Sequence, residues 1–157
     1  MSKTDDFLLE LNRGSAAYLR SIPPLKYKNK IYQLIDNYVA TPTMICDVCG
    51  GYPEWEISII ESTNGHTLHV GNVCIDHLTG QNVSGWMKNF RKKRENIMAN
   101  RKCIDQLTII LEAYDRRSSS MQIPEGTAKE LRAMLNRLGD GLNLNAKQQQ
   151  IVESYQP

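Results

Sequence analysis

Residues 46–51 read Cys-Asp-Val-Cys-Gly-Gly and residues 70–77 read Val-Gly-Asn-Val-Cys-Ile-Asp-His, and these two motifs predict the fold. They contain two pairs of metal-binding side chains, Cys46 with Cys49 and Cys74 with His77. Each pair is separated by two residues, and twenty-four residues lie between the pairs. Structural zinc sites use four nitrogen or sulfur ligands at such spacings. The sequence therefore predicts one closed Zn²⁺ site that supports the fold and does no chemistry.

The residues around the ligands predict how this site is built. Glycines follow the first pair, and a positive φ there lets backbone N–H groups face the sulfurs. Residues 55–60 and 66–70 have the pattern of two strands joined by a turn at Asn64-Gly65. Cys74 and His77 then fall in the first turn of a short helix that ends at Thr79-Gly80. The helix dipole favours a thiolate at that position.

Residues 44–80 resemble the treble-clef zinc fingers. The order of the features is the same: a cysteine turn, or zinc knuckle, at residues 46–51, then a hairpin, then a ligand pair at the start of a helix. The run from Val70 to Cys74, followed by His77 and Leu78, is similar to a motif of small zinc-binding proteins of bacteriophages and other mobile elements. Residues 141–148 are similar to a helix start that often closes phage zinc proteins of this kind. The resemblance implies a zinc module and no particular activity.

The cysteines and histidines allow other assignments. The chain shows no signal peptide or membrane-spanning run, so we expect no disulfides. Cys103 stands alone on a predicted helix and is expected to be a small buried apolar residue. His66 and His69 lie on the predicted hairpin, and either is an alternative to His77 as the fourth ligand.

An enzyme is not expected. Some nucleases of the His-Asn-His type contain a treble clef, and His66, Asn72 and His77 occur here in a similar order. However, His77 is required by the zinc, and no second set of metal ligands follows it. The sequence contains no nucleophile elbow, P-loop or dinucleotide-binding motif.

The charged residues are segregated along the chain. The formal net charge is +2, from 19 basic and 17 acidic residues. No lysine or arginine occurs from Ile31 to Met87, while six acidic residues do: Asp36, Asp47, Glu54, Glu56, Glu61 and Asp76. Thiolates around zinc add further negative charge. We expect this segment to be repelled by nucleic-acid phosphates.

Basic residues follow directly, on a segment whose apolar spacing from Trp86 to Tyr114 predicts one long helix. We expect this helix to contact phosphates of DNA or RNA, and the alternative is a solvated helix face. The candidate nucleic-acid-binding residues are Lys88, Arg91, Lys92, Lys93, Arg94, Arg101 and Lys102.

The remaining segments predict further helices. Two N-terminal helices are expected over residues 7–20 and 26–39. Beyond a polar linker at residues 116–120, two more helices are expected to open with capping boxes at residues 127–130 and 145–148. Gln148, Ile151 and Tyr155 imitate part of a sliding-clamp-binding peptide, with ordinary helix packing as the alternative. The C-terminal helices either pack on the basic helix or offer an apolar face to a partner.

The predicted fold class is α+β and mostly helical, with a treble-clef zinc finger embedded among helices. The expected parts are N-terminal helices packing on the finger (1–43), the finger (44–80), a long basic helix (81–117) and a C-terminal helical hairpin (121–157).

Two functions are compatible with this organisation. The first is a non-enzymatic zinc-binding accessory protein associated with nucleic acid. The second is a phage or mobile-element adaptor or inhibitor. It would bind a larger protein machine, such as a polymerase, nuclease or replication complex, through its acidic finger or its C-terminal helices. No segment is apolar enough to cross a membrane, and we expect the protein in the cytoplasm of a bacterium or host cell.

Overall fold

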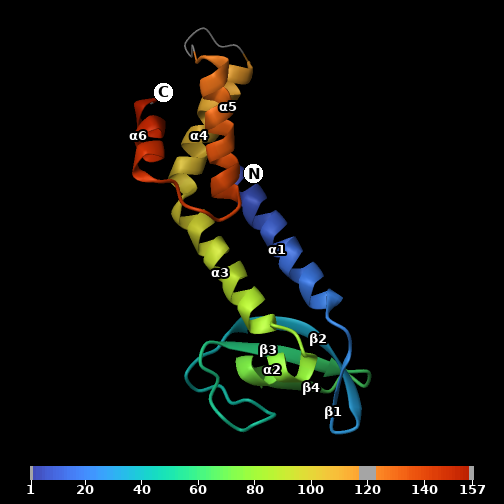
Figure 1. Cartoon of the computed structure of the whole chain (residues 1–157). Coiled ribbons are helices and arrows are strands. Elements are labelled where there is room, and N and C mark those ends of the chain that lie inside the picture. The colour runs from blue at the N-terminus through green and yellow to red at the C-terminus, as the bar shows by residue number, and fades with distance from the viewer. Residues whose placement is uncertain (1, 117–122, 156–157) are drawn as a thin grey trace. The chain divides into compact units, whose positions relative to one another are not determined.

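The computed structural model describes residues 2–116 and 123–155, and the chain divides into two compact units. The sheet unit is Asn12–Phe90, and the helical unit is Met1–Leu11 together with Arg91–Pro157. Residues 117–120 of the predicted linker lie outside the described residues. Figure 1 labels the elements, which are α1 (Lys3–Ser21), β1 (Leu25–Tyr27), β2 (Lys30–Val39), β3 (Glu56–Ser62), β4 (Thr67–Gly71), α2 (Asn72–Thr79), α3 (Val83–Ala99), α4 (Arg101–Asp115), α5 (Glu125–Gly139) and α6 (Ala146–Ser154). The α+β, mostly helical class is confirmed.

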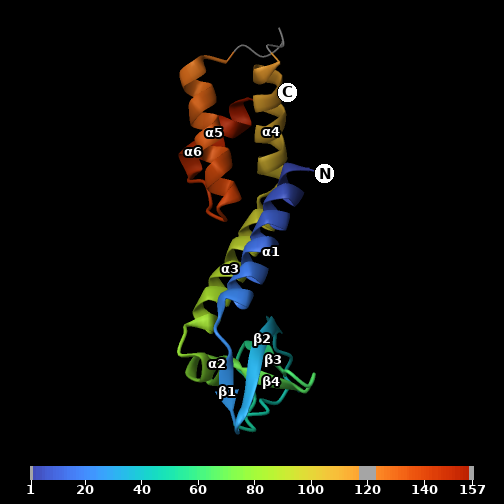
Figure 2. The same cartoon turned by 90° about the vertical axis from the view of Figure 1, so that its right-hand side faces the viewer.

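The sheet unit is built on a four-stranded antiparallel sheet in the order β1-β2-β3-β4 (Figure 2). The predicted hairpin is present as β3 and β4, and Gly65 has φ +83° in the turn between them. The short helix α2 contacts β1, β3 and β4, and Gly80 ends it in the left-handed conformation. Glycine has no Cβ to clash in that conformation, so the predicted end of this helix is correct.

The predicted helix over residues 26–39 is wrong, because this segment forms β1 and β2. Lys28 and Asn29 have φ values of +46° and +63°, which makes a tight two-residue hairpin turn. A β-bulge between Leu34 and Asp36 then inserts one extra residue into β2. The bulge shifts the strand alternation, so apolar residues recur at three- and four-residue intervals and imitate a helix.

The core of the sheet unit lies where α2 and the adjoining parts of α1 and α3 meet the sheet. Tyr18 and Trp86 stack with ring centroids 4.0 Å apart and planes within 4°. Asp76 of α2 caps the start of α3, since its carboxylate accepts hydrogen bonds from the N–H and the hydroxyl of Ser84. The buried apolar residues of this unit are Leu19, Ile22, Leu25, Tyr32, Leu34, Cys46, Ile57, Ile60, Val70, Ile75, Val83, Met87 and Phe90.

The single long helix predicted after Trp86 is two helices, α3 and α4, which break at Asn100. The Asn100 side-chain amide donates to the backbone oxygen of Asn96 at 2.9 Å and to the side-chain oxygen of Asn143 at 2.8 Å. Asparagine amides compete with helix backbone hydrogen bonds in this way. The second of these contacts joins residues far apart in the sequence, so helical periodicity does not reveal the break.

The helical unit buries the apolar faces of α4, α5 and α6 against one another. Ile151 and Tyr155 are packed on this core, so residues of the clamp-like pattern contribute to packing. The predicted capping box of Asn145 and Gln148 is confirmed. The one predicted at Thr127 is wrong, because α5 already begins at Glu125. None of the described helices combines the length and the apolar character that crossing a membrane requires.

Candidate metal centre

The first two cysteines lie in a tight turn between β2 and β3. The Cys46 N–H donates to the Gly51 oxygen at 2.8 Å, and the Gly50 N–H donates to the Cys46 oxygen at 2.8 Å. Gly50 has φ +73°, the conformation that the sequence predicts for a glycine after the pair. Cys74 comes from the first turn of α2, directly after β4. The chain therefore reaches the site from two separate turns.

The three thiols of Cys46, Cys49 and Cys74 lie within 4.8 Å of one another. Around a tetrahedral ion with Zn–S bonds of about 2.3 Å, sulfur atoms stand about 3.8 Å apart, so a small inward movement completes such a site. Cys46 is buried, Cys74 is half-buried and Cys49 is exposed. Backbone N–H groups support two of the sulfurs, Gly71 to Cys46 at 3.2 Å and Gly51 to Cys49 at 3.4 Å. N–H donors of this kind stabilise thiolates.

The electrostatics of the three thiols favour a bound cation. Burial by itself raises the pKa of Cys46, but the N–H groups of Gly71, Cys49 and Val48 outweigh it and hold this pKa below its ordinary value. Burial, followed by the neighbouring Cys49 and Cys46, raises the pKa of Cys74 to about 12. Three thiolates so close together repel one another unless a metal ion neutralises them. The donor set fits a thiolate-binding ion such as Zn²⁺.

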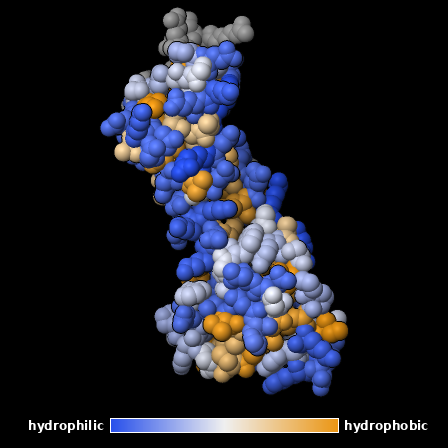
Figure 3. All heavy atoms as spheres, in the orientation of Figure 1, coloured by the Kyte–Doolittle hydropathy of each residue, from blue (hydrophilic) through white to orange (hydrophobic). Residues whose placement is uncertain are grey.

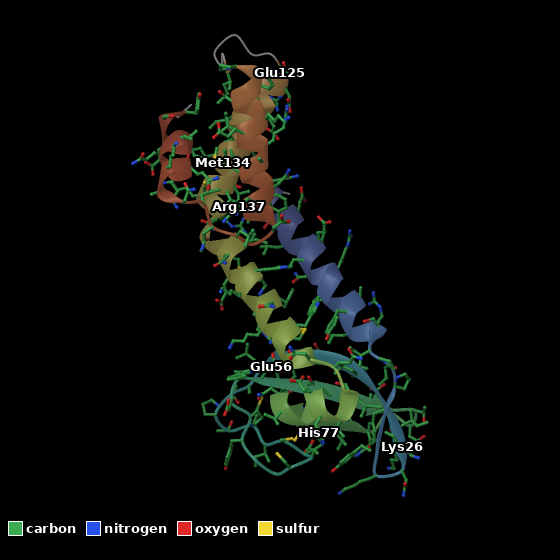
Figure 4. All side chains as sticks on the ribbon, viewed as in Figure 1. Lys26, Glu56, His77, Glu125, Met134 and Arg137 are labelled. Atoms are coloured by element: carbon green, nitrogen blue, oxygen red, sulfur yellow. The ribbon has the colours of Figure 1, made fainter. Side chains whose placement is uncertain are left out.

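The predicted fourth ligand is not among the gathered donors. His77 is exposed on α2, one helical turn after Cys74, and Figure 4 labels it in the part of the sheet unit where yellow sulfur atoms gather. Among the described residues, the group of donors close enough to hold a metal contains the three cysteines and no histidine. His66 and His69 are also exposed on the hairpin. The structure thus brings together three side chains that could hold a metal ion and leaves His77 as a prediction.

Asp47 attaches the cysteine turn to the free edge of the sheet. Its carboxylate accepts the N–H of His69 at 2.7 Å, and its own N–H donates to the His69 oxygen at 2.8 Å. This pair of bonds imitates one more strand beside β4. Together with the bond from Gly71 to Cys46, it fixes the turn opposite Cys74. From the sequence, Asp47 is only one of the acidic residues of this segment, because nothing in the local pattern reveals its partner across the sheet.

A hollow of about 160 Å³ lies beside the three thiols. We call it the thiol hollow, and residues 46, 49, 51–54 and 71–74 line it. Tyr52 and Val73 on its wall are 70% and 71% exposed. Glu54 is its one carboxylate, and no lysine or arginine is among its lining residues. A water molecule takes about 30 Å³ in the liquid, so the hollow is larger than a single metal ion needs.

The structure separates the predicted phosphate-binding residues into groups. Lys88 belongs to the sheet unit, where its Nζ lies 4.7 Å from the centroid of the Trp55 ring. The other six belong to the helical unit. Their environments differ: Arg101 pairs with Asp5 at 3.0 Å, the Arg91 and Arg94 side chains are half-buried, and Lys92, Lys93 and Lys102 are exposed.

No family model matches this chain, and neither the curated proteins nor the solved structures give a significant match.

Proposed function

We propose that this protein is a non-enzymatic, zinc-binding accessory protein that associates with nucleic acid. The observation that carries the metal part is the convergence of Cys46, Cys49 and Cys74, from two separate turns, on a space the size of a metal site. The cysteine turn, the hairpin and the ligand at the start of α2 follow the order of a treble-clef finger. We assign the fourth position to His77, which α2 carries one turn after Cys74.

The zinc in this proposal is structural. When bound, it would be held by three thiolates and one imidazole and would join the cysteine turn to α2. A site closed by four protein ligands has no position left for a substrate, which is the difference between structural and catalytic zinc. Other contacts also favour a structural role, because they hold the ligands in place. These are the hydrogen bonds from backbone N–H groups to Cys46 and Cys49 and the hydrogen bond between Asp47 and His69.

Contact with nucleic acid is assigned to the exposed lysines of the helical unit. Lys92 and Lys93 lie on α3 and Lys102 lies on α4. Each carries a full positive charge on a solvated side chain, as phosphate contact requires. Arg101 is a weaker candidate than its charge suggests, because the Asp5 carboxylate already pairs with it. We expect no base-specific contacts from these lysines.

A salt series tests the assignment. Binding of the zinc-loaded protein to duplex DNA and to single-stranded RNA is measured while the salt concentration is raised. The variant changes Lys92, Lys93 and Lys102 to Gln, and a matched control changes the exposed lysines 26, 28 and 30 to Gln. Each phosphate contact contributes about 0.9 to the slope of log affinity against log salt for duplex DNA. The first variant should therefore lose about 2.7 from the slope, and the control should lose little. Equal slopes, or no binding at low salt, would refute the nucleic-acid assignment.

The second candidate function is an adaptor or inhibitor that docks on a larger protein. The observation that favours it is the exposure of apolar side chains on the sheet unit (Figure 3). In the part of the chain that the structure describes, seven of the eleven exposed large apolar residues belong to that unit: Ile31, Ile35, Val39, Ile45, Tyr52, Trp55 and Val73. Large apolar side chains left exposed in such number on one unit favour a surface that a protein partner covers.

A further inference from the structure

The thiol hollow has the features of a binding site for a side chain. Its volume of about 160 Å³ exceeds what one metal ion occupies, so space remains beside the three sulfurs. Tyr52 and Val73 on its wall are the two most exposed large apolar residues of the described chain, at 70% and 71%. An apolar wall this exposed, beside a concave surface, is the arrangement that recognition sites use.

The charge around the hollow favours a cationic side chain as the bound group. Its lining contains the Glu54 carboxylate and three thiols, and no lysine or arginine occurs from Ile31 to Met87. A long cationic side chain matches both features of this lining. Its methylene stem can lie along Tyr52 and Val73, and its charged head can reach Glu54. A guanidinium or ammonium group also gains from contact with an aromatic face.

The same sheet unit already uses this kind of contact. Lys88 places its Nζ 4.7 Å from the centroid of the Trp55 ring, and Trp55 follows Glu54 directly in the chain. Phosphate-bearing ligands fit the thiol hollow poorly, because Glu54 and the thiolates repel them.

We infer that the thiol hollow is a docking site for a basic segment of a partner protein, which inserts an arginine or lysine side chain between Tyr52 and Val73 and beside Glu54. This inference rests on the second proposed function and is independent of the lysines assigned to nucleic acid. The partner contributes the cation, and this protein contributes the apolar wall and the carboxylate.

The test uses a peptide and a neutral copy of it. Zinc-loaded, ¹⁵N-labelled protein is titrated with the capped tripeptide acetyl-Gly-Arg-Gly-amide and, separately, with the same peptide carrying citrulline, which has the shape of arginine without its charge. The expected result is a saturable shift of the amide signals of Tyr52, Glu54 and Val73 with the arginine peptide and little shift with citrulline. In Glu54→Gln the affinity should fall about threefold to fivefold, the size expected for one exposed charge pair. The matched variant Glu61→Gln, which lies outside the hollow, should bind as the original protein does.

Several results would overturn the inference. These are equal shifts with both peptides, shifts confined to other residues, or no saturation. Shifts of the same amides by an oligonucleotide, or on raising the protein concentration alone, would assign the hollow to nucleic acid or to a second copy and would also overturn it. The zinc content of the sample is measured separately, so the absence of a metal centre cannot be confused with the absence of peptide binding.

Discussion

Replacing Asp47 with alanine should loosen the metal centre without removing a ligand. The Asp47 carboxylate accepts the His69 N–H at 2.7 Å and so holds the cysteine turn against β4. A hydrogen bond to a charged group contributes about 1.5–3 kcal/mol when it is well shielded. The Asp47 side chain is 43% exposed, so water can take over part of its role. We therefore expect a loss of about 1–2 kcal/mol in the free energy of unfolding.

The same loss should appear in the affinity for zinc, because the docked turn is the form that presents Cys46 and Cys49 toward Cys74. A loss of about 1–2 kcal/mol corresponds to an affinity about 5- to 30-fold weaker. Competition with a chelator of known affinity measures it, and denaturant unfolding measures the stability. Asp47→Asn is the matched control, since its side-chain oxygen can still accept the His69 N–H, and it should lose less than half as much. If Asp47→Ala keeps both the zinc affinity and the stability of the original protein, the reasoning is wrong.

Three further predictions concern both units. Cys74→Ser should abolish stoichiometric zinc binding and the folded signal of the sheet unit, whereas Cys103→Ser should retain both; circular dichroism with and without a chelator distinguishes these outcomes. Gly139→Ala should destabilise the helical unit by about 1–3 kcal/mol, because a new Cβ would lie 2.6 Å from Phe7 ring atoms. Gly126→Ala, which lies in the same helix with open space around it, should instead stabilise the unit by up to about 1 kcal/mol in denaturant unfolding, since alanine favours a helix more than glycine does. The Ser2 hydroxyl and Arg101 lower the pKa of Asp5 from its ordinary value of 3.8, so this carboxylate stabilises the fold above pH 3.8 and the stabilisation is lost as the pH falls through the lowered pKa. The difference in melting temperature between the original protein and Asp5→Asn should therefore shrink over that pH range. A constant difference would contradict this assignment.

The sequence predicts the elements around the cysteines well, because residues with strong local preferences mark their ends. Gly50, Asn64-Gly65 and Gly80 each favour a backbone conformation that other residues rarely adopt, and each is found at the predicted turn or helix end. The gathering of Cys46, Cys49 and Cys74 follows from these turns. Such signals act within a few residues and do not depend on the tertiary structure.

The errors arise where contacts between distant residues decide the structure. The bulge in β2 gives a strand the apolar spacing of a helix, and the pairing that reveals it involves β3. The break at Asn100 depends partly on Asn143. The docking of Asp47 on His69 and the exposure of Tyr52 and Val73 beside one hollow likewise depend on partners that the local sequence does not identify. These features therefore require the folded structure.

The most direct test of the metal centre is X-ray absorption at the zinc edge of protein purified without chelators. We predict one zinc per chain with three sulfur neighbours at about 2.3 Å and one nitrogen neighbour at about 2.0–2.1 Å. The nitrogen should be replaced by a different ligand in His77→Ala, while the three sulfurs remain. A folded protein without zinc, or a zinc shell with fewer than three sulfurs, would contradict the account.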